Sequence, residues 1–119
     1  MDRIKKITQN GKTIILVDLS NAKPEDVVTT IPLAYSTIST YAAKSALVLT
    51  NVTNATYNKD VAESIKNFVK NNTPYIRASA VVGAEGVRLI LLNTVIFLTR
   101  REIKTFNTLP EALTWLASH

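Results

Sequence analysis

Residues 79–101, SAVVGAEGVRLILLNTVIFLTRR, constrain the fold more than any other segment of the chain. The segment begins with small and β-branched residues that predict a buried strand, and Gly83 and Gly86 then indicate a Gly-x-x-Gly turn. The helix that follows has apolar residues on nearly every side. Because a helix at a protein surface needs only one apolar stripe, this helix must be covered on more than one side.

Helical spacing divides the apolar side chains of residues 87–98 into two faces. We expect the first face to cover a sheet; it consists of Val87, Ile90, Leu91, Val95 and Leu98. The second face then points elsewhere; it consists of Leu89, Leu92, Ile96 and Phe97. Another helix of the same chain, a second copy of the chain or an apolar ligand could cover it. A second copy would make a two-fold contact through this helix.

The rest of the chain predicts strands that alternate with helices. Asn10-Gly11 lies between two strand-like runs, at residues 3–8 and 13–19, and indicates a hairpin. The other expected strands are at residues 45–50, 75–82 and 102–106, the last being more polar and so near an edge. The order β-β-α-β-α-β-α-β-α predicts an α/β fold with a mixed, mostly parallel sheet of about five strands and about four helices.

Prolines and capping residues mark the helix boundaries. Pro24 begins the first helix, and Pro32 within it predicts a kink or a break near residues 29–32. Asn58 is placed to cap the second helix. Thr108 and Glu111 have the spacing of a capping box at the last helix. The residues of that helix that we expect on the core are Leu109, Leu113, Trp115 and Leu116.

The composition excludes several classes of protein. The 119 residues suffice for one domain, residues 1–119, with its own core. Without cysteine the chain forms neither a disulfide scaffold nor a thiolate metal site. The N-terminus lacks a signal-peptide pattern and no apolar run reaches the ~20 residues of a membrane span, so we expect a cytoplasmic protein. The net charge of +5 is dispersed, which argues against nucleic-acid binding.

The C-terminal third of the chain resembles the SpoIIAA-like family of STAS/SEC14-type domains. That family reads AVVG-x-x-G, an apolar helix, a short strand ending near F-x-T, and then E-A-L-x-W-L. The matching residues are Ala80, Val81, Val82, Gly83, Gly86, Phe106, Thr108, Glu111, Ala112, Leu113, Trp115 and Leu116. The resemblance implies a STAS/SpoIIAA-like fold for the whole chain, and most members of that family have no known function.

Two activities follow from the resemblance as expectations. The better-known relatives are anti-sigma-factor antagonists, in which a kinase phosphorylates a serine of an Asp-Ser-Ser/Thr-Gly motif. At the matching place, residues 50–60, this chain reads TNVTNATYNKD, with no serine and with Thr53 and Thr56 as threonine hydroxyls beyond the strand end. The resemblance thus implies at most a switch without the usual phospho-serine. Its SEC14 side implies an apolar, lipid-like ligand held between helices and sheet.

Three loops, residues 18–23, 51–58 and 83–86, should meet at the carboxyl edge of the sheet, where open α/β sheets bind ligands. Gly83 and Gly86 would let backbone N–H groups approach an anion, although a tight turn alone also needs glycine. The candidate residues for a ligand or partner are Asp18, Ser20, Asn21, Asn51, Thr53, Asn58, Lys59, Gly83, Glu85, Gly86 and Arg88.

The chain offers few catalytic groups. Its only histidine is His119, the last residue, so the usual nucleophile–base pairs are absent. Asp18 and Glu85 could form an acid/base pair, but a loop acid also serves as a local hydrogen-bond acceptor. No ligand spacing indicates a metal, and we expect no cofactor.

These observations favour a non-catalytic binding or regulatory module that self-associates, as a dimer, through the helix at residues 86–99. An apolar-ligand carrier is the alternative, and the switch without a phospho-serine is a lesser one. The expected partners are a second copy of the chain, another regulatory protein or an apolar small molecule.

Overall fold

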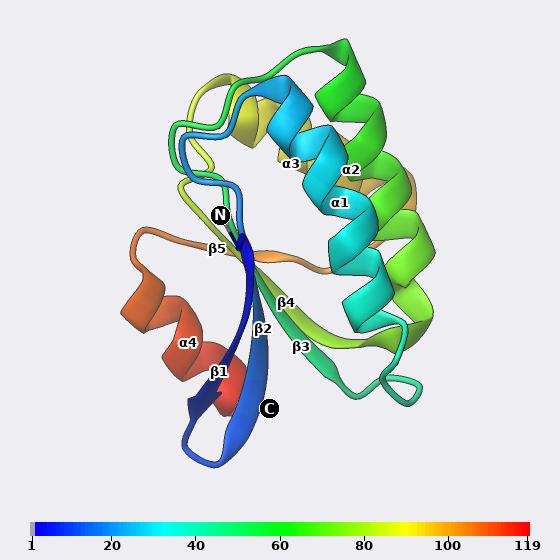
Figure 1. The fold of residues 1–119 in the computed structure, drawn as a ribbon. Coiled ribbons are helices and arrows are strands. Elements are labelled where there is room, and N and C mark those ends of the chain that lie inside the picture. Colours follow the sequence, from blue (N-terminus) through cyan, green and yellow to red (C-terminus); the bar gives the residue numbers. More distant parts are fainter. Residues whose placement is uncertain (1) are drawn as a thin grey trace.

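The fold is described from a computed structural model in which residues 2–119 are placed. These residues form one five-stranded sheet and four α-helices, with a short 3₁₀ turn, η1 (Thr73–Tyr75), before the fourth strand (Figure 1). The strands are β1 (Ile4–Gln9), β2 (Lys12–Asp18), β3 (Ala46–Asn51), β4 (Ile76–Val82) and β5 (Lys104–Phe106). The helices are α1 (Pro24–Ile38), α2 (Lys59–Asn72), α3 (Val87–Thr99) and α4 (Leu109–Ala117).

The strands lie side by side in their order along the chain, β1-β2-β3-β4-β5. β1 pairs antiparallel with β2 through the turn at Asn10 and Gly11, and the other pairs are parallel. The mixed sheet, the element order and the edge position of β5 confirm the prediction. The observed strand ends differ from the expected ones by at most two residues.

Helices cover both faces of the sheet. α1 and α2 pack on one face and α4 packs on the other (Figure 1). Alternate side chains of β2 point to opposite faces of the sheet. Ile15 and Val17 pack on the side of α1 and α2, and Ile14 and Leu16 pack on the side of α4. A strand that is buried on both faces needs an unbroken apolar run, which explains the composition of β2.

The last helix is positioned as its sequence predicts. The hydroxyl of Thr108 accepts a hydrogen bond from the backbone N–H of Glu111 and donates one to its carboxylate. Leu116 is fully buried against the sheet, and Trp115 packs beside it with its ring 5.6 Å from that of Phe106. α4 therefore closes the second face of the sheet.

Pro32 does not break α1. The helix is continuous from Pro24 to Ile38, so of the expected kink or break near residues 29–32 the break is wrong. A proline in a helix interior removes one backbone hydrogen bond and costs about 3 kcal/mol. The buried face of the helix, which includes Val27, Ile31 and Ile38, packs on the sheet on both sides of Pro32 and outweighs that loss.

The orientation of α3 differs from the expected one. Only Leu92 and Val95 are buried. Three residues expected on the sheet are largely exposed: Val87 by 55%, Ile90 by 66% and Leu98 by 58%. Leu92 was expected on the second face, which another helix of the chain could cover, and it is buried where α3 packs against α2. The orientation differs because α3 packs against α2 rather than lying flat on the sheet, which turns a different side of the helix inward.

The outer face of α3 stays uncovered by residues 2–119. Phe97 is 81% exposed and Leu89 is 36% exposed, while Ile96 is half-buried. We define the outer α3 face as the exposed apolar residues Val87, Leu89, Ile90, Phe97 and Leu98. Single exposed apolar residues are ordinary, but five on one helix form a patch that requires an explanation.

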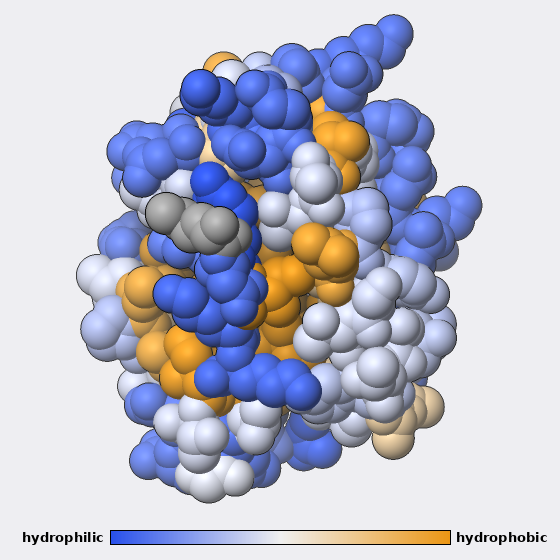
Figure 2. Space-filling view, viewed as in Figure 1, coloured by the Kyte–Doolittle hydropathy of each residue, from blue (hydrophilic) through white to orange (hydrophobic). Residues whose placement is uncertain are grey.

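A different part of the surface is seen in Figure 2. Hydrophilic side chains spread over the face on which β1 and α1 lie, and a strip of apolar side chains shows between the two elements. None of the helices within residues 2–119 is long and apolar enough to cross a membrane.

Candidate functional site

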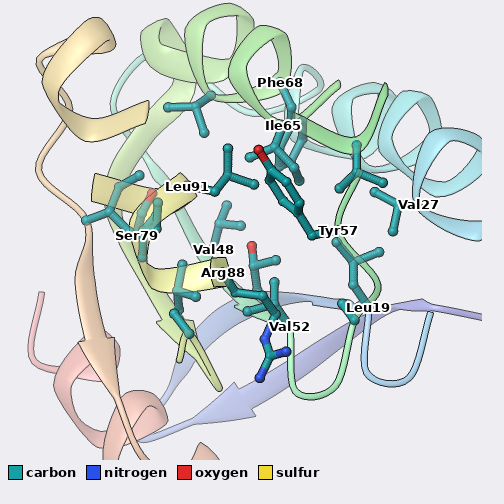
Figure 3. Close-up of a pocket in the computed structure, with 18 of the residues that line it drawn as sticks. Leu19, Val27, Val48, Val52, Tyr57, Ile65, Phe68, Ser79, Arg88 and Leu91 are labelled. Carbon is teal, nitrogen blue, oxygen red and sulfur yellow. The ribbon is translucent and has the colours of Figure 1, made fainter. Parts of the chain in front are cut away.

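An apolar cavity of about 80 Å³ lies between α2, α3 and the face of the sheet formed by β3 and β4 (Figure 3). It is partly open to solvent. The side chains that enclose it come from several neighbouring elements and are mostly aliphatic or aromatic. They include Val48, Ile65, Phe68, Val81, Leu91 and Leu92.

The sequence explains why this space stays open. β4 contributes two short side chains to the floor, Ser79 and Val81. α3 contacts α2 and so stands away from the sheet, where its Leu91 and Leu92 form part of the roof. Short residues below and a tilted helix above leave a void that neither layer fills.

One end of the cavity is polar and is organised by Arg101. The residue before it, Arg100, takes a left-handed conformation (φ 56°) that ends α3 and turns the chain back toward the sheet. Nη1 of Arg101 donates hydrogen bonds to the Val69 carbonyl (3.0 Å) and to Oδ1 of Asn72 (2.7 Å), and more weakly to Oγ1 of Thr73. Nη2 donates to the hydroxyl of Ser79 (2.6 Å).

These contacts give Arg101 a structural role at the end of α2. The Val69 carbonyl belongs to the last turn of α2, where carbonyl groups lack a partner within the helix. Asn72 and Ser79 are buried polar residues, and the guanidinium satisfies both. Burial lowers the pKa of Arg101, because the charged guanidinium loses solvent.

Arg88 lines the cavity at its other margin. Its Nε donates a hydrogen bond to the Gly83 carbonyl (3.2 Å). Figure 3 shows the guanidinium directed away from the apolar side chains of Val48, Ile65 and Leu91. No aspartate or glutamate lines the cavity, and the ion pairs among residues 2–119 involve neither arginine.

The three expected loops do meet at the carboxyl edge of the sheet. Asp18 and Asn51 are register partners on β2 and β3, and Asn51 is the register partner of Val82 on β4. The loop backbones are also joined, since the N–H of Asn21 donates to the Thr53 carbonyl. Parallel pairing therefore places these candidate residues together, as the sequence predicts.

Their polar atoms are largely occupied within the loops. Oδ1 of Asp18 accepts hydrogen bonds from the N–H and the hydroxyl of Ser20. Oδ1 of Asn51 accepts the same pair of bonds from Thr53. Both are local turns of a type that aspartate and asparagine favour, so the loop geometry alone accounts for these residues.

The two glycines of the loop at residues 83–86 are required for different structural reasons. Gly83 has a φ of 85°, and a Cβ atom added to it would lie 2.7 Å from the Cα of Thr53. Gly86 has a φ of 54° but open space around it. Gly83 is therefore required by a close approach of two backbones, and Gly86 by its conformation alone.

The remaining candidates are separated from one another. Asn58 caps α2 by accepting a hydrogen bond from the N–H of Val61 (2.8 Å). Glu85 is exposed, and no hydrogen bond or ion pair among residues 2–119 joins it to Asp18. The ring of His119 packs on Trp115, 4.4 Å between centroids. Within the described part of the chain no three His, Asp or Glu side chains gather as metal ligands.

Sequence reasoning missed the polar end of the cavity. Arg101 was one of several basic residues near the end of α3, with nothing local to single it out. A usable signal was present elsewhere: Ser79 is the polar residue of an otherwise apolar buried segment, and Asn72 ends an amphipathic helix. Two buried polar residues of this kind require a donor from another element.

Comparisons with known proteins identify the fold. No protein-family model matches the sequence, and no curated protein does. The structure is similar to the crystal structure of an uncharacterized protein from the DUF3478 family with a SpoIIAA-like fold, from Shewanella loihica PV-4. The TM-score is 0.68, the match covers 95% of this chain and 91% of that chain, and the sequences are 16% identical. The chain thus has a SpoIIAA-like fold, as the C-terminal motif predicts.

Proposed function

We propose that this protein is a non-catalytic binding module that holds a small apolar molecule in the cavity beneath α3. The observation that carries the proposal is the cavity itself, lined by aliphatic and aromatic side chains of α2, α3 and the sheet. Because the cavity is partly open to solvent, some of its apolar lining stays in contact with water. A ligand that covered this surface would gain roughly 25 cal/mol per Å² of apolar area buried.

The size of the cavity limits the ligand. An engineered cavity of about 150 Å³ binds benzene, so the smaller space here suits a short alkyl chain or a small branched group. A complete lipid tail would fit only if α3 moved. The SEC14 side of the resemblance implies a lipid-like ligand, and the size of the cavity limits that ligand to a small apolar molecule.

α3 covers the cavity, and its movement away from the sheet would admit such a ligand. It buries two of its side chains, it begins at a glycine with positive φ, and it ends at Arg100 in the left-handed conformation. An element with few buried contacts opens at a lower free energy than the core around it. We expect α3 to lift before the sheet or α2 does.

Titration with 1-butanol, a short-chain probe, followed by ¹H–¹⁵N NMR, tests the proposal. We expect saturable shifts at Val48, Ser79 and Leu91. Leu91→Trp fills the cavity and should abolish them, whereas Ile90→Trp adds the same side chain at the exposed neighbouring position and should not. Native mass spectrometry of freshly purified protein would reveal a retained ligand. Absence of saturable shifts, or equal shifts in Leu91→Trp, would overturn the proposal.

The outer α3 face favours a second candidate, self-association of the chain as a dimer. Its five residues are exposed together on one helix, and Phe97 is the most exposed large apolar side chain among them. Light scattering across a concentration series tests this candidate. We expect a concentration-dependent dimer that Phe97→Glu disrupts; a monomer at all concentrations would exclude it while leaving the ligand proposal intact.

A further inference from the structure

The charge of Arg101 is unusual for its surroundings. The guanidinium lines one end of a mainly apolar cavity, and its four hydrogen bonds all end on neutral oxygens of Val69, Asn72, Thr73 and Ser79. No carboxylate within residues 2–119 forms an ion pair with it. A partly buried cation without a counter-ion is costly, and an anion brought into the cavity would reduce that cost.

Arg101 also keeps donors that the protein does not use. A guanidinium has five N–H groups. Nη1 is engaged by α2 and its end, and Nη2 donates to Ser79, but Nε has no acceptor among the described residues. No fully buried side-chain nitrogen in this part of the chain lacks a partner, so Nε must still be accessible. The unused donors therefore remain open to a ligand.

The charges of the side chains that line the cavity favour binding of an anion over binding of a cation. Arg88 and Arg101 both line the cavity, and no acidic side chain does. Hydrogen bonds to α2 and β4 already hold the Arg101 guanidinium in place, so little of its freedom would be lost on binding. A carboxylate matches the fork of a guanidinium and accepts two parallel N–H···O hydrogen bonds from it.

We propose that the cavity selects a short-chain monocarboxylate. Its carboxylate accepts hydrogen bonds from the free donors of Arg101, and its alkyl chain lies among Val48, Phe68 and Leu91. The inference rests on the proposed apolar-ligand function and adds the head group that the ligand carries.

Calorimetric titration with pentanoate and with 1-butanol, which share the butyl chain, tests the inference. We expect pentanoate to bind at least about tenfold tighter, the order of magnitude of one charge-assisted hydrogen bond. Arg101→Gln should remove this preference. Arg100→Gln, at the exposed neighbouring position outside the cavity, should keep the preference.

A measurement on the wild-type chain tests the inference even if the Arg101→Gln variant does not fold. The ¹⁵Nε resonance of Arg101 should shift on addition of pentanoate and not on addition of 1-butanol. Equal affinities for the two ligands would overturn the carboxylate inference and leave the proposed function standing. Binding of neither ligand would overturn both. Loss of the preference in Arg88→Gln instead of Arg101→Gln would overturn the assignment to Arg101.

Discussion

Nη2 of Arg101 donates a 2.6 Å hydrogen bond to the hydroxyl of Ser79, which joins the segment after α3 to the middle of β4. The same guanidinium reaches the end of α2 through Nη1. One side chain therefore fixes the relative positions of three elements around the cavity. Because α3 itself buries few residues, this connection is a main restraint on where its C-terminal end lies.

Replacement of Arg101 by methionine should destabilise the fold. Methionine keeps the apolar stem but no donor, so Asn72 and Ser79 lose their partner while they remain buried. We expect the free energy of unfolding, measured with urea, to fall by about 1–3 kcal/mol. Arg100→Met, at the exposed neighbour, should change it by less than about 0.5 kcal/mol. Equal losses in the two variants would contradict the role given to Arg101.

The two glycines before α3 should respond differently to alanine. Gly86→Ala introduces conformational strain alone, for which about 1–3 kcal/mol is expected. Gly83→Ala adds a collision with the Thr53 backbone, so it should cost more and broaden the NMR resonances of residues 51–58. A smaller loss for Gly83→Ala than for Gly86→Ala would refute the close approach of the two loops.

Asn58 should contribute to stability through its cap. Asn58→Ala removes the acceptor of the Val61 N–H and should cost about 1 kcal/mol in thermal or urea unfolding, and Asn58→Asp should restore most of it. Asn67→Ala is the control, because Asn67 is exposed within the same helix and alanine is the better helix former. We expect that variant to be neutral or slightly more stable.

The two sides of α3 should differ sharply in a pair of alanine substitutions. Leu92→Ala removes a buried side chain and should cost about 2–5 kcal/mol. Phe97→Ala removes a larger side chain that is 81% exposed and should change monomer stability by less than about 0.5 kcal/mol. If Phe97→Ala were the more damaging at low protein concentration, the orientation of α3 would be wrong.

Most of the fold could be predicted because its signals are local. The Asn10-Gly11 turn, the apolar run of β2 and the caps at Asn58 and Thr108 each depend on neighbouring residues. The order of strands and helices then leaves few topologies, and the observed one is among them. Pro32 shows the limit of this approach, since packing on the sheet holds α1 together across it.

The rotation of α3 could not be predicted for a physical reason. A helix with apolar residues all around has no polar side to indicate which way it faces. Its orientation is decided by contact with α2, which joins residues far apart in the sequence. The same contact between α2 and α3 creates the cavity, so the cavity could not be predicted from the sequence either.

The candidate site likewise has one part that the sequence predicts and one part that it does not. The meeting of the three loops followed from parallel strand order, and it brought Asp18, Asn51 and Gly83 to one edge. The polar residues that organise the cavity, Asn72, Ser79 and Arg101, come from α2, β4 and the segment after α3. No spacing along the chain links them, because only the tertiary fold brings them together.

The strictly sequential strand order has a consequence for biosynthesis. Each strand pairs with the one made just before it, so the growing sheet never waits for a distant partner. α4 is the exception, because it covers a face built from residues as early as Ile7 and as late as Phe106. A nascent chain must therefore carry this apolar face uncovered until the nine residues of α4 are made. That interval is when the protein is most exposed to aggregation and to capture by chaperones.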